Sequence, residues 1–256
     1  TIRKKILFSE HHESHAASCY YPSPFKNSAI LTIDGVGEDT TTSIAHGKDD
    51  KITFLKEILF PDSIGLLYSA FTFYLGFKIN SGEYKVMGLA PYGKPKFKSL
   101  ILNNLIDVKK DGSFKMNMKY FDYQYGYKTI NQNFIDLFKE KRRSPESRLK
   151  EFHMDISSSI QNVIEEIVIK LCKTAKKLTN SDNLVLAGGV ALNCVANGKI
   201  LNEKIFKGTW IQPASGDAGG SLGVALSIYH KHLGHKRNVD ENSDSMFGSY
   251  LGNKFE

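Results

Sequence analysis

Two consecutive segments in the last third of the chain share one order of parts: a short apolar run, a glycine-rich turn and a helical segment. In the first, residues 183–187 form the apolar run and Gly188-Gly189 the turn. In the second, residues 209–212 precede a turn with Gly216, and residues 221–231 form the helical segment. Strands that are each followed by such a turn and a helix are typical of α/β folds. The sequence therefore predicts the α/β class.

The glycines of these turns allow two interpretations. Glycine lets a ligand approach backbone amides at a helix N-terminus, which is a natural seat for an anion or a nucleotide. Alternatively, each glycine serves only the close packing of helix against strand. Both interpretations apply to Gly188, Gly189 and Gly216.

A histidine-rich segment lies near the start of the chain, at residues 10–18. Its small residues predict a helix, which places His11 and His15 on one face at i and i+4, where two imidazoles can bind one metal ion. His12 points about 100° away on an ideal helix, so we interpret it as a neighbour and not a ligand. Solvated helix faces also carry this spacing, and the sequence alone leaves that alternative open.

Two aspartates in glycine-rich settings could complete a metal site. Asp34 ends the apolar run 28–34, which predicts a buried strand, and Asp217 lies in the second glycine-rich turn. Two histidines with one or two carboxylates and open positions form the ligand set of a divalent catalytic metal such as iron or manganese.

The turn after Asp34 has the pattern Asp-Gly-x-Gly, and threonine-rich residues 40–45 follow as a predicted strand, with another at 52–60. In actin-like nucleotide-binding lobes such a turn wraps phosphates, with glycines such as Gly35 and Gly37 admitting backbone amides. Taken alone, an Asp-Gly turn is mostly a hairpin.

The middle of the chain is less informative. Residues 63–77 predict a helix whose apolar stripe needs no explanation beyond packing. Glu83 and Lys85 could position an anionic group or pair with each other across a loop surface. The pattern blurs over residues 94–148, where the basic run 139–145 predicts an exposed linker, and a long helix follows to about residue 179.

Composition restricts the class of protein. The 256 residues, 41% of them hydrophobic, suffice for one large or two small domains. A net charge of +7 fits a phosphate site or a lysine-rich surface, and without a nucleic-acid motif we expect no nucleic-acid partner. Three cysteines without metal-like spacing predict reduced core thiols. With no apolar run of roughly 20 residues and no signal peptide, we expect a cytoplasmic protein that does not bind membranes.

Eight segments, in order, resemble the carbamoyltransferase family typified by nodulation protein U and the O-carbamoyltransferases of antibiotic biosynthesis. They span nearly the whole chain, and eight motifs in register are far more specific than one. The segments are HHESHAAS (11–18), SPF (23–25), IDGVGE (33–38), SIGLLYSAFTFYLGF (63–77), GEYKVMGLAPYG (82–93), HMDISSSIQ (153–161), LAGGVALNCVANGK (186–199) and PASGDAGGSLGVAL (213–226).

The resemblance implies an actin-like, ribonuclease-H-like two-lobed fold of the ASKHA type, akin to tRNA threonylcarbamoyl-transferase proteins. On this basis we expect residues 1–93 to be the remainder of the first lobe, 94–148 an elaboration or linker, and 149–256 the second lobe. It further implies an iron-like divalent metal, with manganese or zinc as alternatives. The implied ligands, which would also be the catalytic residues, are His11, His15, Asp34 and Asp217.

The implied reaction moves a carbamoyl group from carbamoyl-adenylate, made from carbamoyl phosphate and ATP, to a hydroxyl of a small-molecule acceptor. The metal would act as a Lewis acid. The expected nucleotide-binding residues are Gly35, Gly37, Lys85, Gly188, Gly189, Asn193 and Gly216.

Two departures from the family pattern shape the expected activity. The first lobe of the family begins about a hundred residues before the histidine motif, and a second domain, which forms carbamoyl-adenylate, follows the point near residue 252. We therefore expect a fragment or processed chain, lacking the first N-terminal strands of the fold, that holds the transfer site without completing the reaction alone. A predicted strand at 4–8 precedes the histidines. A homodimer is compatible with the sequence.

Two other functions stay open. One is a catalytically silent scaffold that keeps the fold and binds nucleotide. The other is a kinase or ATPase of the same superfold, since fold does not fix function. The His11 and His15 pair discriminates against a kinase, which holds magnesium mainly through oxygen ligands.

Overall fold

The computed structural model describes residues 6–126 and 128–253, and these residues divide into two compact units that alternate along the chain. Unit 1 comprises the residues up to Glu57, Ala175–Leu192 and the residues from Lys204, while unit 2 comprises Ile58–Thr174 and Asn193–Glu203. The units are thus not consecutive ranges. The expected assignment of 1–93, 94–148 and 149–256 to lobes and a linker stays a prediction.

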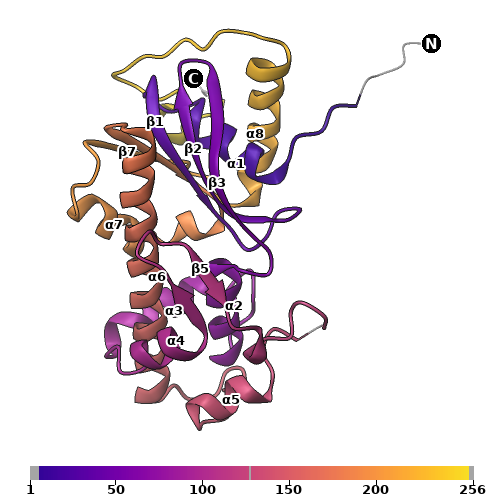
Figure 1. Ribbon diagram of the computed structural model, residues 1–256, viewed down its shortest axis with the longest axis vertical. Helices are drawn as coiled ribbons and strands as arrows, with labels where there is room; N and C mark the ends of the chain where they lie inside the picture. The colour runs from indigo at the N-terminus through magenta and orange to yellow at the C-terminus, as the bar shows by residue number, and fades with distance from the viewer. Residues whose placement is uncertain (1–5, 127, 254–256) are drawn as a thin grey trace. The chain divides into compact units, whose positions relative to one another are not determined.

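Unit 1 is built on a five-stranded mixed sheet with the order β3-β2-β1-β6-β7 (Figure 1). The central strand β1 pairs antiparallel with β2 and parallel with β6, and β7 continues the sheet parallel to β6. All but the first residue of β1 are buried, as its near-continuous apolar run predicts. The strands are β1 (Asn27–Ile33), β2 (Thr40–Lys48), β3 (Lys51–Leu59), β6 (Asn183–Ala187) and β7 (Gly208–Ile211). This sheet with its helices confirms the predicted α/β class.

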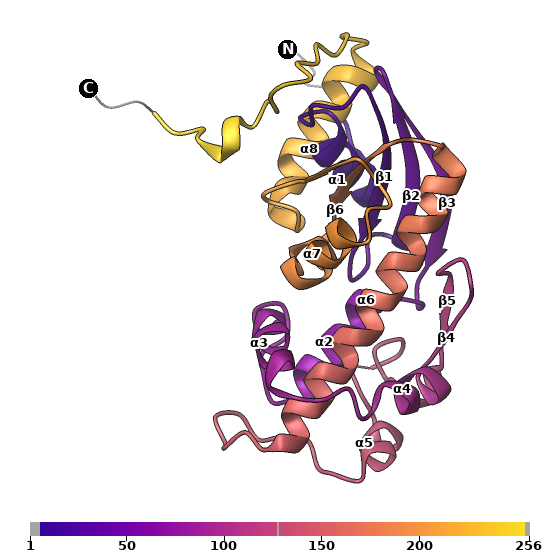
Figure 2. The same ribbon diagram turned by 90° about the vertical axis from the view of Figure 1, so that its left-hand side faces the viewer.

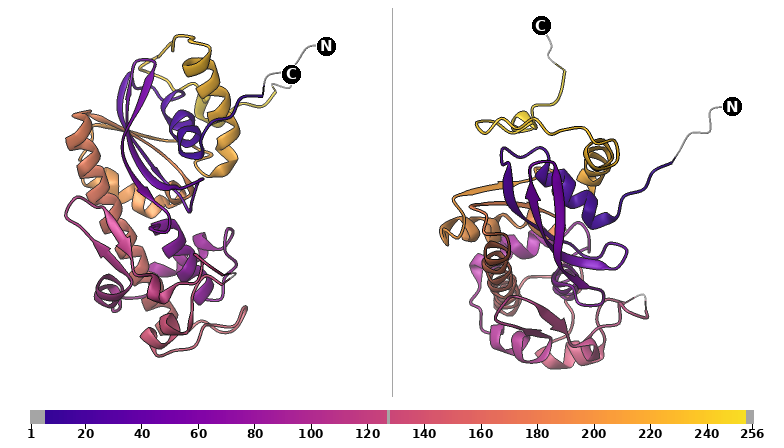
Figure 3. Two further views of the ribbon diagram at one scale, coloured as in Figure 1. Left: turned by 45° about the vertical axis from the view of Figure 1, so that its right-hand side comes forward. Right: turned by 45° about the horizontal axis from the view of Figure 1, so that its top comes forward.

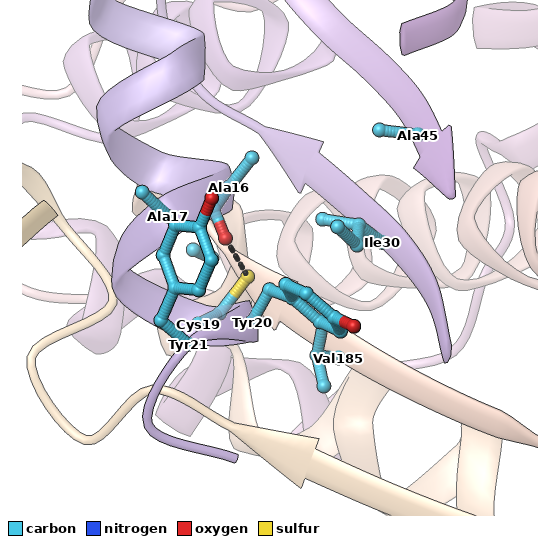
Figure 4. Packing of buried hydrophobic residues seen from close by; sticks show 9 residues of the cluster. Ala16, Ala17, Cys19, Tyr20, Tyr21, Ile30, Ala45 and Val185 are labelled. Carbon is cyan, nitrogen blue, oxygen red and sulfur yellow. Dashed lines mark hydrogen bonds between the residues drawn. The ribbon is translucent and has the colours of Figure 1, made fainter. Parts of the chain in front are cut away.

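The predicted histidine-rich helix is present as α1 (His11–Tyr20). It packs on β1, β2 and β6 with one side and against α8 (Gly220–Ser227) with the other, so that it forms a middle layer in unit 1 (Figure 2). The last turn of α8 continues as a π-helical turn, η5 (Ile228–His232). Figure 4 shows the core between α1 and the sheet. Ala16, Ala17, Cys19 and Tyr20 of α1 and the following Tyr21 cluster there with Ile30 of β1, Ala45 of β2 and Val185 of β6.

Unit 2 is mostly helical, with one small hairpin (Figure 3). Its core is aromatic: the ring of Phe134 makes edge contacts with Phe71 and Tyr74, with centroids 5.2 and 5.4 Å apart. The elements are α2 (Ile64–Tyr74), α3 (Glu83–Leu89), η1 (Ala90–Tyr92), α4 (Lys98–Asn104), β4 (Ile106–Val108), β5 (Phe114–Met116), η2 (Met118–Tyr120), α5 (Gln132–Phe138), most of α6 (Glu151–Thr179) and α7 (Cys194–Asn202). The predicted helices at 63–77 and up to 179 are confirmed as α2 and α6.

The basic run 139–145 is exposed at Lys139, Lys141, Ser144 and Pro145, as its composition predicts, but not at its two arginines. Arg143 is buried, and its Nε donates a hydrogen bond of 2.6 Å to the carbonyl of Leu75 at the end of α2. Its guanidinium lies 4.9 Å from the centre of the Phe77 ring, and that of Arg142 lies 3.9 Å from the Phe73 ring. The last carbonyls of a helix lack intrahelical partners, and arginine supplies donors for them. Part of the run is therefore a packing element.

Two smaller expectations also need revision. Cys19 and Cys172 are buried free thiols as predicted, but Cys194, the first residue of α7, is exposed. Of the strand predicted at 4–8, Lys4 and Lys5 lie outside the described residues, and Ile6–Phe8 have no regular secondary structure.

Within the described part of the chain, every helix is too short or too polar to span a lipid bilayer.

Candidate metal centre

The sheet of unit 1 brings distant parts of the chain to one edge. Strands β1, β6 and β7 are parallel, so their carboxyl ends meet there, and the segments that follow them carry Asp34, Gly189 and Asp217. This edge is where open α/β sheets bind ligands. Helix α1 precedes β1 and runs against it, so its first turns, with His11 and His15, reach the same edge.

Four side chains converge at this edge. His11 Nε2 lies 2.8 Å from Asp34 Oδ2 and 3.0 Å from His15 Nε2, and His15 Nε2 lies 3.2 Å from Asp34 Oδ2. Asp217 Oδ1 lies 3.3 Å from His11 Nε2 and 3.6 Å from His15 Nε2. The four ligand atoms all lie within 4.8 Å of one another.

These distances fit a common ion. Nitrogen and oxygen ligands bound at about 2.0–2.2 Å from one metal lie roughly 2.8–3.6 Å apart when they are neighbours in tetrahedral or octahedral arrangements. Two imidazoles and two carboxylates also form a suitable donor set for iron, manganese or zinc. The side chains of His15 and Asp34 are 1% and 12% exposed, whereas that of Asp217 is 76% exposed. The group is therefore anchored on one side and open on the other.

The electrostatics of the group favour positive charge at its centre. Burial alone would raise the pKa of Asp34, but hydrogen bonds from His11, His15 and the Gly189 amide hold that pKa well below its usual range. The hydrogen bond to Asp34 raises the pKa of His11, and burial opposes this shift. Carboxylates that stay ionised beside imidazole nitrogens are what a divalent cation requires.

His12 lies outside the group, as the helical geometry predicts. Its Nδ1 lies 2.6 Å from Thr32 Oγ1 on β1, and that hydroxyl lies 2.6 Å from Ser43 Oγ on β2. Burial lowers the pKa of His12 to about 4, so this imidazole is neutral at physiological pH. It ties α1 to the sheet beside the two candidate ligands.

The Gly188-Gly189 turn has a packing explanation in this structure. Gly188 has φ +94°, and a Cβ there would overlap the carbonyl of Ile33 at the end of β1. The amide of Gly189 donates a 3.0 Å hydrogen bond to Asp34 Oδ1, and a Cβ on Gly189 would lie 2.8 Å from that oxygen. Only glycines allow the turn to approach and orient Asp34 in this way. Nucleotide binding by this turn stays a prediction.

The other expected nucleotide contacts lie in both units. Gly35, Gly37 and Gly216 belong to unit 1, and Lys85 and Asn193 belong to unit 2. A Cβ on Gly216 would make only ordinary contact with Leu192. The role of these residues in nucleotide binding stays a prediction.

Two of these residues have structural partners already. Asn193 caps α7, because its Oδ1 accepts a hydrogen bond from the Ala196 amide, and its side-chain amide pairs with that of Gln161. The ammonium of Lys85 lies 5.8 Å from the centre of the Phe77 ring. Its expected partner Glu83 instead accepts hydrogen bonds from Ser69 Oγ and the Asn80 amide.

One contact at the centre has no counterpart among the predicted site residues. The carboxylate of Glu38 accepts the backbone N–H of His11, with oxygen distances of 3.0 and 3.3 Å. A sequence signal was present, since Glu38 ends the same glycine-rich turn that begins at Asp34. Its partner is 27 residues away in the sequence, which no local pattern reveals.

Comparison with known proteins identifies a matching family model and similar proteins. The family model described as "Carbamoyltransferase N-terminus" matches residues 1–226. An uncharacterized protein of Synechocystis sp. is 57% identical over 98% of this chain and 40% of its own length. The nodulation protein NolNO of Sinorhizobium fredii is 35% identical over 97% of this chain and 35% of its own length.

A further similarity covers only part of the chain. A tRNA N6-adenosine threonylcarbamoyltransferase of Polynucleobacter necessarius is 37% identical over 31% of this chain and 22% of its own length. The chain thus spans two fifths or less of each of these relatives.

Proposed function

Because the chain belongs to the carbamoyltransferase family, shown by the match over residues 1–226, we propose that it carries the site of carbamoyl transfer. The donor is carbamoyl-adenylate and the acceptor is a hydroxyl of a small molecule. The observation that supports this proposal is the convergence of His11, His15, Asp34 and Asp217 at the carboxyl edge of the sheet.

In this proposal the four side chains hold a divalent ion, with iron favoured and manganese or zinc as alternatives. His15 and Asp34, which are buried, fix the position of the site, and the exposed Asp217 contributes a ligand from the solvent side. A bound ion would supply Lewis-acid polarisation of the phosphate and carbamoyl oxygens of the adenylate. The Gly189 amide keeps Asp34 oriented throughout, because it bonds the carboxylate oxygen that faces away from the histidines.

The wider reaction is proposed on the same basis. Carbamoyl phosphate and ATP supply the carbamoyl-adenylate, and we assign its formation to a part of the relatives that this chain does not span. The candidate nucleotide contacts are Gly35, Gly37, Lys85, Gly188, Gly189, Asn193 and Gly216. The free thiols of the three cysteines support a cytoplasmic location.

The test is metal content by elemental analysis of protein purified without a histidine tag. His15→Ala and Asp217→Ala are purified alongside, with His46→Ala as a matched control, since His46 lies in unit 1 on β2 and bonds Asn27 instead of the group. We expect near-stoichiometric metal in the parent and in His46→Ala, and loss of metal in the other two variants. A folded parent that takes up no metal would overturn the proposal and favour a non-catalytic scaffold.

A further inference from the structure

Helix α1 carries both histidines but does not cap its own N-terminus. Its N-cap residue, Glu10, makes no side-chain hydrogen bond to the helix. By contrast, Ser63, Asn131 and Asn193 each accept a backbone N–H in the first turn of their own helices α2, α5 and α7. The first N–H groups of a helix need such acceptors, and uncapped ends fray. His11 is the first residue of α1, so fraying would affect this candidate ligand first.

The missing cap is supplied by the loop between β1 and β2. Both carboxylate oxygens of Glu38 lie within hydrogen-bond distance of the His11 amide, at 3.0 and 3.3 Å. The negative charge of Glu38 also lies at the end of α1 where the helix dipole favours it.

The loop is built to make this contact. The Gly37 amide donates to the Thr40 carbonyl at 2.8 Å, and the Asp34 amide donates to the Thr41 carbonyl at 2.9 Å, which fixes both ends of the loop on β2. A Cβ on Gly37 would lie only 2.9 Å from His11 Cβ, so the loop passes directly against the start of the helix. One short loop thus presents Asp34 to the imidazole of His11 and Glu38 to its backbone.

We propose that Glu38 is a positioning residue for the metal centre: by capping α1 it keeps His11 Nε2 within coordinating distance of the ion that Asp34 binds. Glu38 is not itself a ligand in this inference, which rests on the proposed function. His15, one turn further along α1, depends less on the cap.

Three variants separate this role from other effects. Glu38→Ala removes the acceptor, and Glu38→Gln keeps one acceptor oxygen without the charge. Asp39→Ala removes the neighbouring exposed carboxylate of the same loop. For each, we would measure the dissociation constant of Co²⁺ by competition with a chromophoric chelator and the visible absorption spectrum of the Co²⁺ complex. In the metal-free protein, NMR would follow hydrogen exchange of the His11 amide.

We expect Glu38→Ala to weaken Co²⁺ binding by about 10–100-fold, the usual effect of removing a residue that supports a ligand. Its Co²⁺ spectrum should change, because His11 is replaced by solvent, and its His11 amide should exchange faster. Glu38→Gln and Asp39→Ala should stay close to the parent in all three measurements. A general loss of stability in Glu38→Ala would not produce a changed Co²⁺ spectrum, because the spectrum reports the geometry of the ligands. It would also not explain why glutamine at position 38 restores the behaviour of the parent.

Each other outcome overturns a defined part of the argument. If Glu38→Ala binds Co²⁺ like the parent, or if Asp39→Ala loses as much affinity, the positioning role is wrong while the proposed function stands. If the parent itself binds no Co²⁺, the proposed function fails and the role in coordination fails with it. The exchange of the His11 amide would then still show whether Glu38 caps α1.

Discussion

Each compact unit buries a histidine and an aspartate, but the two pairs have different surroundings. In unit 1, His15 and Asp34 are 1% and 8% exposed as whole residues, and their polar atoms converge with those of two further titratable side chains. In unit 2, His153 and Asp155 on α6 are each 4% exposed.

The unit 2 residues are each satisfied separately. The Lys150 amide donates a 2.9 Å hydrogen bond to His153 Nδ1. Asp155 accepts the Lys94 amide at 2.7 Å with one carboxylate oxygen, and the other lies 2.7 Å from the ammonium of Lys96. A lysine is a permanent cation at physiological pH, so the charge of Asp155 is compensated within the protein.

The comparison shows that burial of titratable groups does not by itself indicate a site. Asp155 is a closed structural group, because donors and a fixed cation match its oxygens. Asp34 faces two imidazoles and a second carboxylate, Asp217, so its group has an excess of lone pairs and no permanent cation among its members. Excess acceptors that converge on one point are what distinguish a metal centre from a buried ion pair.

The largest expected difference between the two aspartates is in metal affinity. Asp34→Asn removes a ligand charge but keeps an acceptor for the Gly189 amide, so we expect affinity to fall by more than the roughly 10–100-fold typical of a supporting residue. Asp155→Asn should bind metal like the parent. Competition with a chelator measures both. Equal losses in the two variants would contradict the distinction between an open and a closed aspartate.

The next largest effect concerns the close packing of α8 against α1 and its contribution to stability. A Cβ on Gly223 of α8 would overlap the carbonyl of Ser14, so Gly223→Ala must separate α8 from α1. We expect a loss of about 1–3 kcal/mol in the free energy of unfolding, as for other overpacked cores. In unit 2, Gly198 of α7 faces open space, and Gly198→Ala should be neutral or stabilising by up to about 1 kcal/mol. Urea denaturation compares the two, and a stable Gly223→Ala protein would show that α1 is not tightly enclosed.

Much of the fold and of the centre could be predicted from local patterns. Burial requires apolar residues at particular positions, and these are visible in the sequence. They appear as apolar runs in β1 and β6 and as helical spacing in α2 and α6. The i, i+4 spacing identified His11 and His15, and glycine-rich turns after predicted strands identified Asp34 and Asp217. Strand ends of a parallel sheet share one edge, which is why residues far apart in sequence could be grouped.

What could not be predicted depends on tertiary contacts. Arg143 lies in a run that is typical of a solvated surface, and only the end of α2, 68 residues earlier, makes it a buried donor. Glu38 acquires its role from the amide of His11. Gly188 shows a third limit, because a glycine required for packing and one required for a ligand look identical in sequence.

A smaller effect tests the closed group of unit 2. Asp155→Ala leaves the Lys94 amide without its acceptor, so we expect a loss of about 1–3 kcal/mol in the free energy of unfolding, with metal content unchanged. Glu151→Ala is the matched control, because Glu151 pairs with the same Lys96 while 77% exposed, and such surface pairs contribute about 0–1 kcal/mol. Thermal or urea unfolding measures the loss of stability in the two variants. Equal losses in Asp155→Ala and Glu151→Ala would mean that the buried hydrogen bond to the Lys94 amide contributes nothing beyond a surface ion pair.

The smallest effect is a pH dependence from His153. Burial lowers the pKa of His153, and Arg143 and Lys150 lower it further. In the unfolded chain this imidazole takes up a proton near pH 6.5, so below that pH the unfolded state binds more protons and the folded state loses stability as the pH falls. His153→Gln offers an acceptor to the Lys150 amide without titrating.

We therefore expect this variant to lose less stability than the parent between about pH 7 and about pH 5, as measured by urea unfolding of the metal-free protein. The exposed His232→Gln variant should keep the slope of the parent. An unchanged slope in His153→Gln would mean that folding does not keep His153 neutral. The contrast would then rest on geometry alone: His153 accepts the backbone amide of Lys150, whereas the ring nitrogens of His11 and His15 meet beside a carboxylate.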